Sequence, residues 1–261
     1  MMKNLRLWTC LVTVMLLLTG CGNNKEGDEP SVDPQVPVYS LEKPKDLRAV
    51  DLGLSVLWAS CNLGASSPEK YGGYFAWGDP TGALWSADGI GWNENGYTWD
   101  TGNYGGKYPW SNIGGTSQDV VTTHWSSGWR TPDVTEAAEL CNYCQWILHD
   151  EGGTKWYEVV GPNGNSIILP LGGYYGDDPQ NATHRFLEGP VETNVVGYYW
   201  TSSICPSTMM NEEERGYAVN SGIKTAWLFV CNSELGDITE LGKFTDFLRA
   251  FHMSIRPVRS K

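Results

Sequence analysis

Two cysteines three positions apart are the residues whose types and spacing most directly suggest chemistry. Cys141 and Cys144 form a C-x-x-C motif in the segment AELCNYCQW. Such a motif is a redox couple where a helix N-terminus stabilises its thiolate, and it is half of a zinc site where further ligands complete a tetrahedron. In a third interpretation, both cysteines pack in the core as small apolar side chains. The elements that position them decide between these interpretations.

The sequence around the motif predicts a helix over about 133–148. Asp133 is placed to cap this helix, and Glu136 completes a capping box three residues later. Apolar residues then recur at helical spacing and share one face: Ala137, Leu140, Cys141, Cys144, Ile147 and Leu148. Cys141 lies eight residues past the cap, where the helix dipole gives a thiolate little support. The position of the motif therefore argues against a redox couple.

Metal binding at the motif finds equally little support. The chain has no second C-x-x-C motif and no H-x-x-x-H pattern among its histidines, which are His124, His149, His184 and His252. The sequence therefore favours core packing for both cysteines. A disulfide stays open as an alternative, because an exported protein meets an oxidising environment. The cysteines available for it are Cys61, Cys141, Cys144, Cys205 and Cys231.

The N-terminus predicts export. Lys3 and Arg6 precede an apolar run over residues 7–18, which is the organisation of a signal peptide spanning residues 1–20. The run is about 12 residues long, whereas a membrane-spanning helix needs roughly 20. Leu18-Thr19-Gly20-Cys21 resembles the bacterial lipobox. This resemblance implies that Cys21 becomes a lipidated N-terminus, so that the mature chain is tethered to a membrane through its lipid anchor.

Residues 21–44 predict a flexible linker between the lipidated cysteine and a folded domain. They are polar and proline-rich, with little to bury. Glu26, Asp28 and Glu29 follow the cysteine; these acids resemble the signal by which Bacteroidota send lipoproteins to the outside of the outer membrane, and they are equally ordinary for a solvated linker. Removal of residues 1–20 changes the net charge from −12 to −14. Because the chain is this acidic, it repels nucleic acid, and we therefore expect neither DNA nor RNA as a partner.

Residues 45–261 predict one domain that is rich in strands and loops. Apolar and β-branched runs bounded by turn residues are LSVLWASC, NSIILPLGGYY, GYYWTSS, TAWLFVCN and HMSIRPV. Gly161-Pro162-Asn163-Gly164 predicts a turn that joins WYEVV to NSIIL in a hairpin. A second, short helix is predicted over about 119–125.

The segment 83–110 is the strongest candidate for a binding surface. It contains aromatic residues among glycines, asparagines and acids: Trp85, Trp92, Tyr97, Trp99, Tyr104, Tyr108 and Trp110. Flat rings beside amide and carboxylate groups suit a sugar, because a ring covers the apolar face of a pyranose while polar groups bind its hydroxyls. In the alternative interpretation, these rings hold a long loop against the domain.

Calcium is the one metal for which the same segment offers ligands. Asp88, Asn93 and Glu94 carry oxygen donors, but the D-x-D-x-D-G order of a dedicated calcium loop is missing. The sequence indicates no other metal or cofactor, and no nucleophile motif such as G-x-S-x-G accompanies the histidines.

Five blocks of the domain carry a resemblance to a known family. They are AVDLGLSVLWASCNLGASSPEKYGGYFAWGD (49–79), GWRTPDVTEAAELCNYCQW (128–146), YEVVGPNGNSIILPLGGYYG (157–176), GYYWTSS (197–203) and SIRPV (254–258). Together, and in this order, they resemble the Fibrobacter succinogenes major paralogous domain family of Bacteroidota surface lipoproteins. The resemblance implies a C-type-lectin-like fold, a loop-rich α+β domain with its terminal strands brought together. The E-P-N, Q-P-D and W-N-D signatures of calcium-dependent sugar binding do not occur.

Three functions follow as expectations. The first is a non-catalytic outer-membrane lipoprotein, facing the cell exterior, that binds a glycan or a surface protein through its aromatic-rich loops. The second is a structural or accessory subunit of a surface assembly. The third is an enzyme acting on polysaccharide, which requires two carboxyl groups about 5 to 10 Å apart.

Overall fold

The protein has an α+β fold with antiparallel sheets. The computed structural model describes residues 40–82, 92–93, 96–97, 111–175, 190, 192–205, 225–233, 243–248 and 251–261. Its described helices are α2 (Val120–Trp125) and α3 (Val134–Tyr143). The strands are β1 (Ala49–Asp51), β2 (Val56–Ala59), β3 (Phe75–Ala76), β4 (Trp92–Asn93), β5 (Gly96–Tyr97), β6 (Gln145–Glu151), β7 (Thr154–Val160), β8 (Ser166–Pro170), β9 (Val196–Ile204), β10 (Thr225–Asn232), β11 (Lys243–Leu248), β12 (His252–Met253) and β13 (Val258–Ser260).

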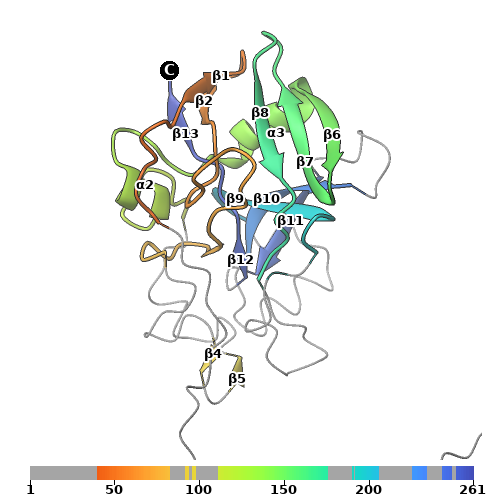
Figure 1. Ribbon diagram of the computed structural model, residues 1–261. Coiled ribbons are helices and arrows are strands. Elements are labelled where there is room, and N and C mark those ends of the chain that lie inside the picture. Colours follow the sequence, from red (N-terminus) through yellow and green to blue (C-terminus); the bar gives the residue numbers. More distant parts are fainter. Residues whose placement is uncertain are drawn as a thin grey trace, which may run out of the picture. The chain divides into compact units, whose positions relative to one another are not determined.

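One sheet joins the beginning of the described chain to its end. The strand β2 lies between β1 and β13, and all its pairings are antiparallel (Figure 1). Trp58 in β2 faces Val50 on one side and Val258 on the other, and its side chain is fully buried. Lys261 Nζ lies 2.9 Å from Asp51 Oδ1, and this contact holds the pKa of the Asp51 carboxyl below its usual range. The first and last strands are thus one structural unit.

Two further three-stranded sheets enclose the buried side chains. One has the order β6-β7-β8 and the other has the order β11-β10-β9. One core cluster lies under β7, β8 and α3 and includes Leu140, Val159 and Phe229. The other core cluster includes Trp77 and Trp125, so it packs α2 against the segment that follows β3. The predicted strands in LSVLWASC, NSIILPLGGYY, GYYWTSS and TAWLFVCN are found as parts of β2, β8, β9 and β10. The predicted run HMSIRPV is instead divided between β12 and the start of β13, which lie in different sheets. The predicted hairpin is the β7–β8 pair, closed by a hydrogen bond from Gly161 N to Asn165 O.

The two predicted helices have different outcomes. The short helix over about 119–125 is confirmed as α2, which is capped by Asp119. The helix over about 133–148 begins as predicted, because Asp133 and Glu136 form the expected capping box. However, it ends at Tyr143, and the prediction for its last turn is wrong.

Pairing in a hairpin is the reason for the early end of α3. Cys144 has extended backbone angles (φ −98°, ψ 153°), and β6 then runs in register with β7 around Gly152 and Gly153, both of which have positive φ. Strand pairing over the full length of β6 therefore overrides the helical spacing of its apolar residues. As a consequence, Ile147 and Leu148 lie on a strand and are exposed, instead of packing on a helix face.

Candidate functional site

The C-x-x-C motif lies where α3 meets β6, with Cys141 in the last turn of the helix and Cys144 at its C-cap. Both side chains are half-buried and pack against the core cluster beneath α3. Burial raises the pKa of Cys141 to about 12 and the pKa of Cys144 to about 11. A redox couple needs the opposite change, a lowered pKa. The environment of the motif suits core packing, and Cys61, Cys141, Cys144 and Cys231 are free thiols.

Most of the aromatic segment predicted to bind a ligand lies outside the described residues. This applies to Trp85, Trp99, Tyr104 and Trp110, to the calcium candidates Asp88 and Glu94, and to the lipidation site Cys21. Trp92 and Tyr97 are Cα partners in the β4–β5 pair, next to the pair of Asn93 with Gly96. Within the described ranges, no cluster of three or more histidine, cysteine, aspartate or glutamate side chains is placed to hold a metal.

Two buried carboxylates hold the fold together. Asp119 accepts hydrogen bonds from Val121 N (3.0 Å), Thr131 N (2.9 Å), Thr131 Oγ1 (2.7 Å), Thr122 Oγ1 (2.9 Å) and Gly115 N (3.2 Å). Glu136 binds both terminal nitrogens of Arg130, at 2.7 and 2.5 Å, and accepts from Asp133 N. These acids fix the start of α2 and of α3, so their oxygens are already occupied by structural hydrogen bonds.

Asp79 is a buried carboxylate that sequence reasoning did not single out. Its Oδ1 accepts from Thr81 N (2.9 Å) and Thr81 Oγ1 (2.8 Å), whereas its Oδ2 has no hydrogen-bond partner. The G-D-P-T-G sequence that contains it reads as a simple turn. A single group of this kind does not form a site.

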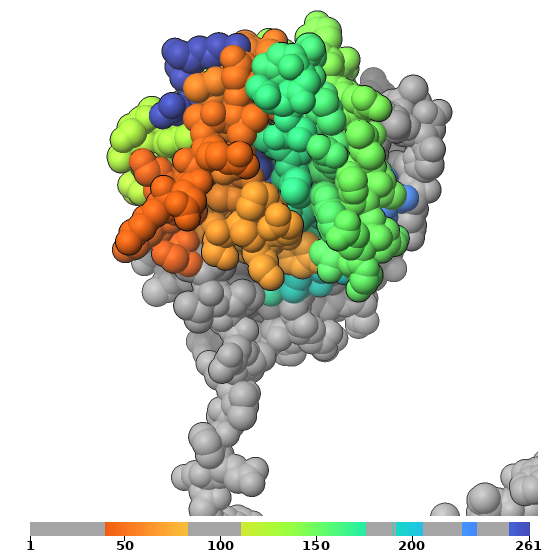
Figure 2. All heavy atoms as spheres, turned by 45° about the horizontal axis from the view of Figure 1, so that its top comes forward, coloured from red at the N-terminus to blue at the C-terminus, as the bar shows by residue number. Residues whose placement is uncertain are grey.

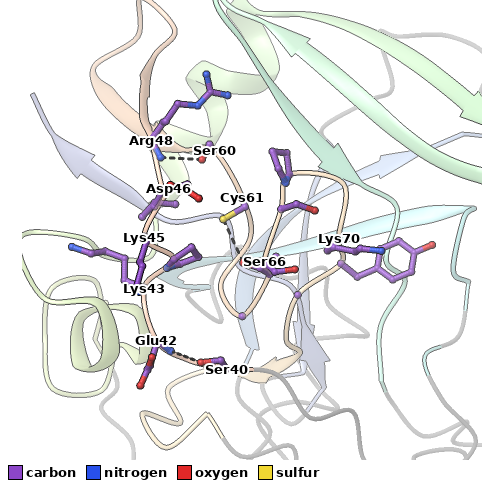
Figure 3. Close-up of a pocket in the computed structure, with 18 residues that line it drawn as sticks. Ser40, Glu42, Lys43, Lys45, Asp46, Arg48, Ser60, Cys61, Ser66 and Lys70 are labelled. Atoms are coloured by element: carbon purple, nitrogen blue, oxygen red, sulfur yellow. Dashed lines mark hydrogen bonds between the residues drawn. The ribbon is translucent and has the colours of Figure 1, made fainter.

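A groove of about 940 Å³ among the described residues is a candidate site. It lies between a first wall, residues 40–48, and a second wall, the loop at residues 60–72. Figure 2 shows the first wall (red-orange) beside the segments that follow it (orange) on one face of the domain. In Figure 3, Lys43, Lys45 and Asp46 lie on one side of Cys61, and Lys70 lies on the other.

Hydrogen bonds within and between the walls give the groove a fixed shape. Ser60 Oγ accepts from Arg48 N at 3.1 Å, and Ser60 N donates to Arg48 O at 2.9 Å. Within the second wall, the Cys61 thiol donates to Ala65 O. Burial raises the pKa of the Cys61 thiol, which makes it a poor nucleophile. Leu41 and Leu47 pack against the core, so the first wall is held by apolar contacts as well.

A buried arginine holds the second wall from behind, although it does not line the groove itself. The Arg256 guanidinium donates to Asn62 Oδ1 (2.8 Å), to Ala59 O (2.9 Å) and to Ile168 O. Asn62 Nδ2 in turn donates to Tyr71 O at 2.8 Å, which links the arginine to the far end of the second wall. No carboxylate of the described residues pairs with Arg256, and desolvation lowers the pKa of its guanidinium. The SIRPV block therefore carries a residue that fixes the second wall.

Gly72 is the second fixed point of the groove. Its φ is +79°, and a Cβ at this position would lie 2.5 Å from Leu63 O. Only glycine combines this left-handed conformation with such close backbone contact at low cost. The YGG sequence thus shapes the second wall.

The charge of the groove differs in sign from that of the whole protein. The residues that line it include four cationic ones, Lys43, Lys45, Arg48 and Lys70, and two acids, Glu42 and Asp46, whereas the chain has a net charge of −12. Glu69 is a third acid of the second wall, but it does not line the groove. All four cationic side chains are exposed, and none forms an ion pair within the described part of the chain. Serine hydroxyls from both walls lie among them: Ser40, Ser60, Ser66 and Ser67.

Sequence reasoning missed this groove. It assigned residues 21–44 to the linker, whereas Leu41 packs against the core and Ser40 to Pro44 line the first wall. The available signal was the sequence EKPKDLR, a concentration of basic residues in an acidic chain. The groove could not be predicted from that signal alone, because its second wall comes from a different part of the sequence.

Comparisons with known proteins give no independent guide to this site. No model of a protein family, no curated protein and no solved structure matches the chain. None of the described helices is long and apolar enough to cross a membrane.

Proposed function

We propose that the mature chain is a lipid-anchored protein of the outer membrane, facing the cell exterior, that binds an acidic glycan without catalysing a reaction. The glycan would occupy the groove between residues 40–48 and 60–72, in a domain of C-type-lectin-like fold. The observation that carries the proposal is the excess of unpaired cationic side chains in this groove.

The chemistry of the groove fits a sugar that carries carboxylate or sulfate groups. Ammonium groups donate charge-assisted hydrogen bonds to such anions, and serine hydroxyls both donate to and accept from sugar hydroxyls. The net charge of the whole chain opposes the approach of any anion, so the local excess of Lys43, Lys45 and Lys70 has to overcome it. A neutral sugar can accept ordinary hydrogen bonds from these residues but has no negative charge for them to bind. The groove therefore favours an acidic glycan over a neutral one.

The fixed geometry of the walls also supports binding. Arg256, Asn62 and Gly72 hold the second wall in one conformation through buried contacts. A site that is already in its bound shape loses less conformational entropy when a ligand enters.

Binding is favoured over catalysis because of the state of the buried acids. Glycoside hydrolysis needs one carboxyl group with a raised pKa and a second one that is free to act as a base or nucleophile. Asp119 and Glu136 bind backbone amides, hydroxyls or Arg130, so neither one is free for that role. Asp79 has one oxygen without a hydrogen-bond partner, but a single carboxylate does not supply the pair that hydrolysis needs. Glu42 and Asp46, the acids of the groove, are exposed and lie on the same wall.

The test is affinity electrophoresis through gels that contain a uronate-rich polysaccharide, a sulfated one or a neutral one. The mature chain, with Cys21→Ser to prevent acylation, should be retarded by an acidic polysaccharide and not by the neutral one. The double variant Lys45→Gln and Lys70→Gln should lose most of the retardation, whereas Lys155→Gln should keep it, because Lys155 lies on β7 away from the groove. Equal retardation of both variants would contradict the proposal.

The same gels test the aromatic segment as an alternative location. If Trp92→Ala and Trp99→Ala abolish retardation while the lysine variants do not, then the ligand binds at segment 83–110. That result would keep glycan binding and reject the groove. Retardation by the neutral polysaccharide alone would reject the acidic ligand.

A further inference from the structure

The exposed apolar side chains of the described residues are concentrated at one place. The large apolar residues that are exposed are Tyr143 (67%), Leu148 (41%) and Ile147 (37%). All three lie at the end of α3 or on β6. Ile147 and Leu148 are neighbours in a strand, so they point to opposite faces of the sheet. Both faces of β6 are therefore open at this point.

The strand β6 is also the edge of its sheet. It pairs with β7 over seven consecutive residues without a bulge, and no strand of the described residues pairs with its other side (Figure 1). The far side of the sheet is different: Asn163 Nδ2 and Asn165 Nδ2 both donate to Asp51 O at 2.8 Å, which docks the start of β8 against β1. On its free side, β6 therefore presents a row of edge amides and carbonyls beside the exposed side chains of Ile147 and Leu148.

Edge strands of soluble proteins are normally protected by proline, lysine or a bulge. The sequence of β6, QWILHDE, contains none of these, and its acids Asp150 and Glu151 stand at the turn end. Asp150 Oδ2 lies 3.8 Å from Lys155 Nζ, and His149 Nε2 lies 3.3 Å from Glu158 Oε2. The polar side chains of β6 near the turn therefore contact side chains of β7. An unprotected edge of this kind is suited to pair with a strand of another chain.

The charge pattern of β6 identifies the strand that fits it. We infer that β6 pairs antiparallel with β6 of a second copy of this chain, about a two-fold axis at Leu148. In this register, Leu148 faces Leu148 of the second copy, and Ile147 faces its His149. Each acidic end then faces a neutral end, since Asp150 is opposite Trp146 and Glu151 is opposite Gln145. A parallel pair would place the acids of both copies side by side, which is unfavourable.

The pairing forms a closed, isologous dimer, because the same strand serves as donor and acceptor on both sides. Seven residues per copy form a small interface, below the roughly 1,200 Å² that stable complexes bury. The dimer should therefore be weak and depend on protein concentration. The inference does not rest on the proposed glycan binding, since the groove and β6 share no residue.

Sedimentation velocity of the full mature chain with Cys21→Ser tests the inference. The unsubstituted chain should shift from monomer to dimer with rising concentration. Leu148→Lys places two like charges opposite each other at the axis and should weaken dimerisation by at least about tenfold. Ser117→Lys adds the same charge at an exposed residue outside β6 and should have no effect. A monomer at all concentrations, or equal dimerisation of both variants, would overturn the inference.

Disulfide trapping tests the register even if Leu148→Lys fails to fold. Leu148→Cys should form a covalent dimer under mild oxidation, because the axis places the two new thiols directly opposite each other. Thr154→Cys, at the start of β7, should stay monomeric. Formation of a covalent dimer by Thr154→Cys but not by Leu148→Cys would overturn the register. Capture of a different protein by β6, in place of a second copy of this chain, would overturn the choice of partner.

Discussion

Alkylation of the C-x-x-C thiols tests the account of the motif quantitatively. Burial raises the pKa of Cys141 from 9.0 to about 12 and that of Cys144 from 9.0 to about 11. Only the thiolate reacts, so at pH well below both values the reactive fraction falls tenfold per pKa unit. Relative to the unfolded chain, Cys141 should react about a thousandfold more slowly and Cys144 about a hundredfold more slowly.

Iodoacetamide labelling at pH 8, read for each cysteine by peptide mass spectrometry, measures these ratios. The chain should be the Cys21→Ser form, and the reference should be the same chain unfolded in urea. Cys231 serves as an internal control for a fully buried thiol, because its side chain is inaccessible. Labelling of Cys141 within tenfold of the unfolded rate would refute the core-packing interpretation and reopen the redox one.

Four further predictions concern stability, pH and location. Asp119→Ala leaves buried backbone amides without acceptors and should lower the free energy of unfolding by about 3–5 kcal/mol in urea titration. A loss below about 1 kcal/mol would show that these hydrogen bonds contribute little. Gly72→Ala should cost at least about 1–2 kcal/mol in the same assay because of its positive φ and its contact with Leu63 O, and it should weaken glycan retardation. Because the folded pKa values of Cys141 and Cys144 are raised, their contribution to the free energy of unfolding is complete below pH 9.0 and is lost as the pH rises toward about 12. Cys141→Ala should lessen the fall in the free energy of unfolding over that pH range. An alkaline titration of the variant that matches that of the unsubstituted chain would contradict the assignment. Cys21→Ser should move the protein from the membrane fraction to the soluble fraction, and retention in the membrane fraction would contradict anchoring through Cys21.

Local signals in the sequence predicted the start of each helix well. Asp119 and Asp133 each cap a helix by accepting from a backbone amide two or three positions further on, so this part of their effect is visible without the fold. The bonds from Asp119 to Thr131 span twelve positions and could not be predicted in this way. The same holds for the turn at Gly161, which closes the β7–β8 hairpin. Short-range hydrogen bonding is therefore where the sequence was a reliable guide.

The end of α3 was not predictable in the same way. Ile147 and Leu148 fit a helical face in the sequence, but the pairing of β6 with β7 decides their conformation. This pairing depends on residues beyond the turn at Gly152, which a window on the helix does not include. Tertiary pairing thus replaced the predicted last turn and exposed two apolar residues.

The groove shows the same limit at longer range. Arg256 and Asn62 are 194 positions apart, yet their hydrogen bond helps to fix the second wall. The local sequence around either residue does not indicate that the other is its hydrogen-bond partner. Lys45 and Lys70 likewise line one groove only because residues 40–48 fold beside the loop at 60–72. The aromatic segment 83–110, in contrast, is recognisable from the sequence because its aromatic residues lie close together in the chain.

Lysine footprinting in the presence of an acidic glycan tests the central claim most directly. The mature chain is acylated with a lysine-specific reagent, with and without a polysaccharide that retards it in gels, and each lysine is quantified by mass spectrometry. The account predicts that the glycan protects Lys43, Lys45 and Lys70, while Lys155 reacts equally in both samples. Equal modification of the groove lysines with and without glycan would contradict the claim that the groove is the binding site.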